Sequence, residues 1–328
     1  MQDIVIGIDV SKDRMDVAFL HDGIFTMKEF ANQEKGYVAL INWLRRKGVS
    51  SAPICMEATG SYSERIAEYF YEAGFPVSVV NPLQIKRFGQ SQLLRTKTDR
   101  ADARVIAAFA QKMSPSLWQP ASAAMKALRN NVRQLTRLKN LLLQEKNRVQ
   151  EERDPVVRTS IERVIDFLKQ EIKQFESNSE SQIKNNSSLL EQRRLLESIP
   201  GIGVETAKQI MAHIDMERFE HAKQVSAFVG LNPRQHQSGS SIRGRTRISK
   251  MGDCKLRKVF YMPAVVAIKY NPVIAEFYDN LLRRGKPKMV AICAAMRKLL
   301  HIAYGVLKSK TPFSLDAARL KILKEKTA

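Results

Sequence analysis

The sequence predicts an α/β domain built on a mixed sheet, then a helical connector and a mainly helical C-terminal domain. Short apolar runs alternate with helical stretches up to about residue 112. Beyond them, apolar residues recur every three or four positions, and the last third is mostly helical by pattern. A chain of 328 residues can bury more than one core. We therefore expect domains at 1–118, 119–190 and 191–328.

The first domain begins with hairpin strands and continues as alternating strands and helices. Its predicted elements are a strand IVIGID ending at Asp9, hairpin strands MDVAFL and GIFTMKEF around His21 and Asp22, a helix at 33–47, a strand PICMEA ending at Glu57, a further helix, a strand FPVSVVN, and helices beginning at Pro82 and Asp99. This order is typical of a mixed sheet with helices on its faces.

The connector contains two amphipathic stretches separated by Pro155. Its repeating apolar residues are Met125, Leu128, Val132, Leu135, Leu138, Leu142 and Val149, then Val157, Ile161, Ile165, Leu168, Ile172 and Phe175. This spacing predicts an antiparallel helical hairpin or coiled coil. The polar run SNSESQIKNNSS, 177–188, predicts a loop or flexible linker.

The charge of the chain is strongly basic and uneven. Fifty-four Lys and Arg against 33 Asp and Glu give +21, and the stretch 238–300 holds 14 basic and three acidic residues. About half of the net charge therefore lies in under a fifth of the chain. Such a concentration favours binding to a polyanion, most commonly nucleic acid.

The remaining composition argues against several classes of protein. Cys55, Cys254 and Cys293 are widely spaced without a CxxC motif, which disfavours a disulfide framework or a cysteine-rich zinc site. The start MQDIVIGIDV is unlike a signal peptide, and no run approaches the length of a membrane span. We expect a cytoplasmic protein in a reducing compartment.

Four carboxylates are placed for metal binding. Asp9 and Glu57 each end an apolar strand, and Asp99 and Asp102 share a helix face. Together they could hold two Mg²⁺ or Mn²⁺ ions for phosphoryl transfer. Individually each could instead be a turn or cap residue, with Thr98 as another possible cap. Their joint order is the one that an RNase H-like fold requires, so we favour the metal site.

The ATPase fold of actin-like proteins and sugar kinases shares the opening strand and hairpin. That fold needs glycine with Thr or Ser directly after the strand aspartate, so that backbone amides can approach phosphate. Here Asp9 is followed by Val10, Ser11 and Lys12. The alternative is therefore weak.

The string IPGIG resembles the turn of a helix-hairpin-helix unit. Gly201 and Gly203 would let the backbone approach DNA, and the following helix N-terminus could bind phosphate. An ordinary Pro-Gly turn between packed helices is the alternative. The basic region downstream favours nucleic-acid binding.

A serine- and arginine-rich segment, HQSGSSIRGRTRISK, lies within that basic region. Arginine forks hold phosphate oxygens, and a nearby serine could attack the phosphorus. The residues alone do not choose among Ser238, Ser240 and Ser241, and His236 is only adjacent in sequence. A basic loop that contacts backbone phosphates is the simpler interpretation. The candidate contacts are Arg243, Arg245, Arg247 and Lys250.

Motifs along nearly the whole chain resemble one enzyme family. In order they are GIDVSKDRMDV, CMEATGSY, NPLQIKRFGQSQLLRTKTDRADAR, LLESIPGIG, FVGLNPR and QSGSSIRGRTRISKMG. This series resembles the DEDD-type transposases of a bacterial insertion-sequence family that includes the Piv-like DNA invertases. Members that act as bridge-RNA-guided recombinases look especially similar.

The resemblance implies a RuvC-like N-terminal domain, a coiled-coil connector and a C-terminal transposase domain. It assigns catalytic carboxylates to Asp9, Glu57, Asp99 and Asp102 and the nucleophile to Ser238. It also implies donor and target DNA, a structured bridge RNA from the element, and a homotetramer whose active sites combine carboxylates of one subunit with the serine of another. Base pairing by RNA would leave the protein to bind backbones, which suits a diffuse positive charge.

Two other functions remain open on the residues alone. A RuvC-like nuclease would resolve branched DNA by water attack and give Ser238 no chemical role. A non-catalytic nucleic-acid-binding protein would use the carboxylates only as caps and turns. Metal dependence separates the last of these from both enzymes, and a covalent protein–DNA adduct separates the recombinase from the nuclease.

Overall fold

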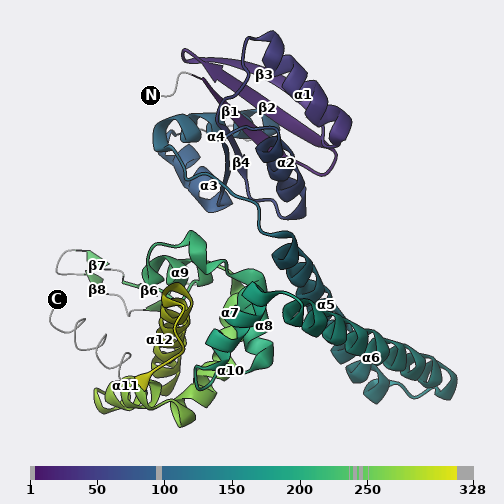
Figure 1. The fold of residues 1–328 in the computed structure, drawn as a ribbon, viewed down its shortest axis with the longest axis vertical. Helices are drawn as coiled ribbons and strands as arrows, with labels where there is room; N and C mark the ends of the chain where they lie inside the picture. Colours follow the sequence, from purple (N-terminus) through teal and green to yellow (C-terminus); the bar gives the residue numbers. More distant parts are fainter. Residues whose placement is uncertain are drawn as a thin grey trace. The chain divides into compact units, whose positions relative to one another are not determined.

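The computed structural model describes residues 4–93, 98–235, 237–238, 242–243, 247–249 and 251–315, and the chain divides into two compact units, 1–121 and 122–328 (Figure 1). The first unit contains β1 (Ile4–Val10), β2 (Arg14–His21), β3 (Ile24–Ala31), α1 (Glu34–Arg46), β4 (Ile54–Glu57), α2 (Ser61–Glu72), β5 (Val77–Val80), α3 (Pro82–Ser91) and α4 (Asp99–Met113). The second contains α5 (Ala123–Glu151), α6 (Pro155–Lys184), α7 (Ser187–Glu197), α8 (Val204–His213), η1 (Met216–Arg218), α9 (Ala222–Val229), β6 (Pro233–Arg234), β7 (Gln237–Ser238), β8 (Ile242–Arg243), β9 (Arg247–Ile248), α10 (Cys254–Tyr270), α11 (Pro272–Arg283) and α12 (Lys288–Ser309).

The first unit is built on a five-stranded mixed sheet with the order β3-β2-β1-β4-β5. The hairpin strands β1, β2 and β3 pair antiparallel, and β4 and β5 continue the sheet in parallel with β1. Asp22 and Gly23, both at positive φ, form the turn between β2 and β3. The predicted mixed sheet is therefore confirmed, and its order and directions are those of an RNase H-like sheet.

The alternation of side chains along each strand divides the sheet into two faces. One face carries Ile6 and Ile8 of β1, which share a core with residues of α1 and α2 such as Leu40 and Phe70. The opposite face carries Val5 of β1, along with Ala18 and Leu20 of β2 and Cys55 of β4, and packs on α3 and α4. Residues two positions apart on a strand share a face, so Asp9 lies on the α4 side with Val5.

Gly7 fixes how closely α4 approaches this face. A Cβ atom at Gly7 would lie 2.4 Å from both the carbonyl oxygen of Ala103 and the amide nitrogen of Ala107. Only glycine therefore allows the α4 backbone to contact β1 at this point. Asp99 lies one helical turn before Ala103, and Asp9 lies two residues beyond Gly7, so the close contact brings the start of α4 over the end of β1.

The second unit begins with two long helices, α5 and α6, that pack against each other and project from the rest of the unit (Figure 1). Leu135 and Leu138 of α5 meet Leu168 and Ile172 of α6 in a shared apolar cluster. Asp154 caps α6 by accepting hydrogen bonds from the next two non-proline amides. The predicted amphipathic helices on either side of Pro155 are thus present.

The loop predicted at 177–188 was wrong. Helix α6 continues to Lys184, and only Asn185 and Asn186 separate it from α7. Ser179 is fully buried, and its hydroxyl donates to the carbonyl oxygen of Phe175 at 2.8 Å. Because that hydrogen bond satisfies the serine within the helix, a run that is polar in composition still forms helix, with Ser179 and Ile183 on its buried side.

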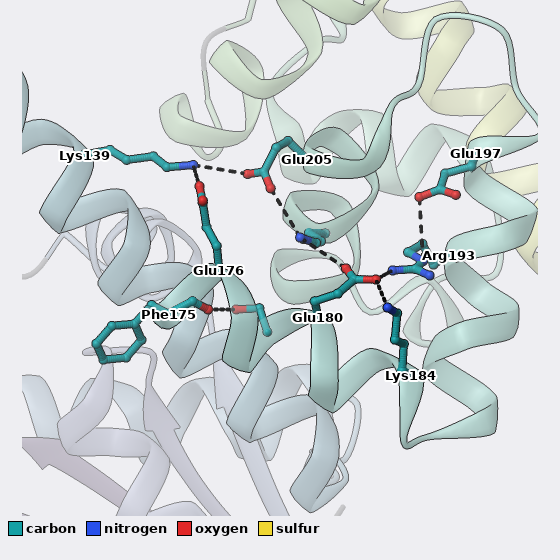
Figure 2. Close-up of polar contacts among 10 residues, drawn as sticks. Lys139, Phe175, Glu176, Glu180, Lys184, Arg193, Glu197 and Glu205 are labelled. Atoms are coloured by element: carbon teal, nitrogen blue, oxygen red, sulfur yellow. Dashed lines mark hydrogen bonds and ion pairs between the residues drawn. The ribbon is translucent and has the colours of Figure 1, made fainter. Parts of the chain in front are cut away.

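An ion-pair network joins the base of this hairpin to α7 and α8 (Figure 2). Glu180 of α6 accepts from Arg193 of α7 at 2.6 Å and lies 3.5 Å from the ammonium group of Lys208 of α8. Lys139 of α5 lies 2.7 Å from Glu176 and 3.5 Å from Glu205 of α8. The Lys208 side chain is only 8% exposed, and its ammonium group is paired with both Glu180 and Glu205.

The remaining helices of the second unit enclose one large apolar core. Helix α12 contributes buried residues along its length, including Ala295, Leu299, Leu300 and Ala303. By length and hydropathy alone α12 meets the criterion for a membrane span, which the sequence did not lead us to expect. The buried residues of α12 pack in this core, which accounts for the apolar character of that face of the helix.

Candidate active site

Three carboxylates lie side by side at one end of the sheet. Asp9 of β1 is paired in register with Asp16 of β2. On the other side, Ile8 pairs with Met56 in the parallel ladder, so the next step places Asp9 beside Glu57 at the end of β4. The neighbours Ala18 and Cys55 put Asp16 and Glu57 on the α4 face, as Gly7 does for Asp9. Asp16, Asp9 and Glu57 therefore form a row on one face.

The first turn of α4 adds two more carboxylates above this row. Thr98 caps the helix, accepting from the amide of Ala101 at 3.2 Å. Asp99 and Asp102 are thus not needed as the cap and remain in the first turn. Both contribute to the electrostatics of Asp9, which confirms that they lie close to it.

The clustering of negative charge is visible in the acidity of Asp9. Burial, followed in order of size by the charges of Asp102, Asp99 and Asp16, raises the pKa of Asp9 to about 6. Burial also raises the pKa of Asp16, whereas the nearby Arg14 opposes that rise. A carboxylate whose pKa is raised by burial and by neighbouring acids is a candidate for a functional site.

Arg14, at the start of β2, supplies positive charge to this cluster. Its Nη2 donates to Oδ2 of Asp99, and its Nε lies 3.6 Å from Oδ2 of Asp16. A third acid, Glu29 of β3, lies 4.0 Å from Nη1. Arg14 therefore connects the α4 carboxylate to the two hairpin strands.

The donors of this cluster suit a hard divalent ion. Carboxylate oxygens are the ligands that Mg²⁺ and Mn²⁺ prefer. Thr59, two residues after Glu57, has a hydroxyl oxygen that is buried and lacks a hydrogen-bond partner within the described residues. No three His, Cys, Asp or Glu side chains in the described part of the chain are close enough to hold one ion together. The carboxylates would thus have to draw together around a metal.

Asp16 was not among the residues that the sequence singled out. It is only 5% exposed and lies directly opposite Asp9. The available signal was its position between the apolar residues Met15 and Val17. In an alternating strand these two side chains point to one face of the sheet, and the side chain of Asp16 points to the other. Recognising it also required the register of β1 and β2, which the sequence pattern alone leaves undetermined.

Ser238 lies on a short β ribbon in the second unit. Ser238 of β7 pairs with Ile242 of β8, and Gln237 pairs with Arg243. Further out, Arg234 of β6 pairs with Arg247 of β9. Between the two ladders the register shifts by one residue, since position 234 pairs with 247 and position 237 with 243.

Only some of the candidate phosphate-binding residues lie within the described part of this ribbon. The backbones of Ser238 and Arg243 lie diagonally across the β7–β8 ladder, and the side chain of Arg247 is exposed on β9. The other members of this candidate group lie outside the described residues: His236, Ser240, Ser241, Arg245 and Lys250.

The two candidate glycines have different surroundings. Gly201 has a φ of +107°, and a Cβ there would lie 2.6 Å from Cβ of Ala267 in α10. Packing against α10 is therefore sufficient reason for glycine at that position. Gly203 is exposed, faces open space and precedes α8 without a side-chain cap. The free amides at the start of α8 are consequently the part of this turn that could bind phosphate.

Comparison with known families gives matches in both units. A model described as transposase, of the DEDD type found in IS110 elements, matches residues 6–152. A model described as the transposase IS116/IS110/IS902 family matches residues 193–279. The first match contains Asp9, Glu57, Asp99 and Asp102, and the second contains Ser238.

Individual proteins agree with this assignment. The pilin gene-inverting proteins of Moraxella bovis and Moraxella lacunata are each 34% identical over 95% of this chain and 98% of their own. The transposase for insertion sequence element IS1111A of Coxiella burnetii is 26% identical over 82% of this chain and 79% of its own. Among solved structures, T. thermophilus RuvC with a Holliday junction substrate aligns with 34% of this chain and 95% of its own, at 14% identity and a TM-score of 0.25. The chain belongs to the IS110 family of DEDD transposases, enzymes that cut and rejoin DNA.

Proposed function

We propose that this transposase exchanges DNA strands by two transesterifications through a phosphoserine at Ser238. The observation that carries the proposal is the row of Asp16, Asp9 and Glu57 beneath the first turn of α4. A concentration of carboxylates with a raised pKa at Asp9 is suited to bind metal at a reacting phosphate. Family membership makes DNA the substrate.

Asp9, Glu57, Asp99 and Asp102 would hold Mg²⁺ or Mn²⁺, with two ions in each site. Bound divalent ions stabilise the charge on the attacking and leaving oxygens of a phosphoryl transfer. Asp9 and Glu57 come from a rigid sheet, whereas Asp99 and Asp102 come from the start of a helix. Sheet residues would therefore define the position of the site, and the helix would close it.

Ser238 would act as the nucleophile. Its hydroxyl loses a proton as the oxygen bonds to phosphorus, and the bond from phosphorus to one deoxyribose oxygen breaks as that oxygen gains a proton. In the second step a deoxyribose hydroxyl of the partner strand attacks the same phosphorus and releases the serine. Each step exchanges one phosphate ester for another, so the bond energy is conserved for rejoining.

The arginines of the ribbon would hold the phosphate that Ser238 attacks. Arg243 pairs with Gln237, diagonally across the ladder from Ser238, and Arg247 is exposed on β9. Guanidinium forks bind phosphate oxygens bidentately and stabilise negative charge that develops there. Arg245 and Lys250 complete the proposed contacts, and the exposed start of α8 at Gly203 would bind the DNA backbone further away.

Guidance by an RNA from the element would select the DNA. The net charge of +21 supplies contacts to nucleic-acid backbones, which bind without reading sequence. A homotetramer, with the carboxylates of one subunit serving the serine of another, would bring four strand ends together in the cytoplasm. Relatives named for gene inversion would perform the same chemistry on differently arranged sites.

The decisive test is a denaturing gel of protein with the element's transcript, Mg²⁺, and labelled donor and target DNA. Wild type should retain label as a covalent adduct, Ser238→Ala should lose it, and Ser240→Ala should keep it. Ribonuclease treatment before mixing should abolish the adduct. Equal cleavage to free ends by wild type and Ser238→Ala would instead identify a nuclease that uses water. Equal amounts of adduct with and without transcript would refute guidance by RNA and leave the serine chemistry standing.

A further inference from the structure

Arg14 occupies a position in the carboxylate cluster where positive charge is most needed. Its guanidinium reaches Asp99 on α4, Asp16 on β2 and Glu29 on β3. Asp16 is almost completely buried and lies on β2, the strand that also carries Arg14, so its carboxylate cannot move far from Arg14. The arginine is consequently anchored at the hairpin and extends toward the helix.

Asp99 is the acid whose position depends on Arg14. The helix does not require it as a cap, because Thr98 provides that function. Its carboxylate instead receives the hydrogen bond from Nη2 of Arg14. Within the described residues no three acids form a ready ligand set, although four of them affect one another electrostatically. The interaction with Arg14 is therefore an alternative to metal ligation for Asp99.

We propose that Arg14 is a positioning residue. Its guanidinium acts as an internal counter-cation that holds the carboxylate of Asp99, and it releases that carboxylate when a divalent metal binds. The inference rests on the proposed metal site. Asp16 and Glu29 would keep the released guanidinium beside the cluster, at 3.6 and 4.0 Å in the present arrangement. Arg14 then lowers the affinity for metal and protects the sheet from carboxylate repulsion before metal arrives.

The competition predicts a gain of metal affinity when Arg14 is removed. Half-exposed ion pairs contribute little free energy, and Arg14 and Asp99 are 49% and 51% exposed. Arg14→Gln should therefore bind Mn²⁺ about two- to fivefold more tightly than wild type, the range such pairs allow. Arg14→Lys keeps the charge and should stay near the wild-type affinity.

The measurement is Mn²⁺ binding to the full-length protein, followed by the electron paramagnetic resonance signal of the free ion. Arg65→Gln is the matched control, because it removes the same charge from α2, on the opposite face of the sheet. A second measurement is thermal unfolding with EDTA or Mn²⁺. Arg14→Gln should lose stability in EDTA and recover it with Mn²⁺, so reduced folding alone would not mimic the result.

The outcomes separate this inference from the proposed function. Equal or weaker Mn²⁺ binding by Arg14→Gln, relative to wild type and Arg65→Gln, would overturn the role of Arg14. Absence of specific Mn²⁺ binding by wild type, or binding unchanged by Asp102→Asn, would overturn the metal site itself. Tighter binding by Arg14→Gln with an unaltered control would establish the competition.

Discussion

Replacing Asp9 with asparagine should stabilise the metal-free protein at neutral pH and abolish DNA cleavage. The pKa of Asp9 is raised from 3.8 to about 6, mainly by burial, so folding disfavours the ionised carboxylate. The pKa of Asp9 is higher in the folded protein than in the unfolded chain. The contribution of protonated Asp9 to the free energy of unfolding is therefore complete below about pH 4 and is lost as the pH rises through 6. Above pH 6 wild type therefore contains a repulsive charge that the amide lacks.

The size of the effect follows from the shift. A rise of about two units corresponds to about 3 kcal/mol at 1.36 kcal/mol per unit. Because Asp9 is partly open to solvent, screening reduces this to about 1–2 kcal/mol. The asparagine can still accept the hydrogen bond from the Val10 amide that the carboxylate receives. The expected gain in unfolding free energy is thus about 1–2 kcal/mol at pH 8 and near zero at pH 4.

Tryptophan fluorescence reports the unfolding of the first unit, which contains Asp9. The chain has two tryptophans, Trp43 and Trp118, and both lie within residues 1–121. Urea unfolding in EDTA at pH 8 and pH 4 would give the two free energies. Asp13→Asn, in the exposed turn between β1 and β2, is the control and should change stability by less than about 0.5 kcal/mol. A loss of stability at pH 8, or an equal gain at both pH values, would refute the electrostatic reasoning.

Three further predictions concern packing and binding. Gly7→Ala should lower the free energy of unfolding by several kcal/mol, because the added Cβ forces α4 away from the sheet. Gly89→Ala, where the nearest contact of a Cβ is at 3.5 Å, should be neutral or slightly stabilising. Urea unfolding followed by fluorescence compares the two variants. Glu180→Gln should destabilise the second unit by about 1–2 kcal/mol, because Arg193 and Lys208 each lose one of their two acids and keep only Glu197 and Glu205; hydrogen exchange in α6–α8 would reveal it as faster opening. Replacing Arg243 and Arg245 together with Ala should flatten the salt dependence of DNA binding by about two ion contacts, and an unchanged slope would place both away from phosphate.

The sequence predicts the positions of the four candidate carboxylates where one strand or helix suffices. Asp9 lies at the last residue but one of β1, Glu57 ends β4, and Asp99 and Asp102 lie in the first turn of a capped helix, so local pattern places all four in the secondary structure. Asp16 required the register between two strands, which depends on the turn that joins them.

Other features depended on distant contacts or on satisfied polar groups. The interaction of Arg14 with Asp99 joins residues 85 positions apart, and no local pattern encodes it. The run 177–188 misled because its composition is that of a loop. In the structure the hydroxyl of Ser179 bonds to Phe175 and Ile183 is buried, so the helix is favoured by contacts with its surroundings.

The attachment of the long hairpin at its base makes its length adjustable. Helix α5 has 29 residues and is therefore about 43 Å long. The ion pairs that fix the hairpin involve Lys139, Glu176 and Glu180, all well away from its tip at Pro155. Removing about seven residues from each helix near the tip would shorten it by about 10 Å and preserve the apolar stripe. The length of the hairpin can thus be changed without disturbing the ion pairs that join its base to α7 and α8.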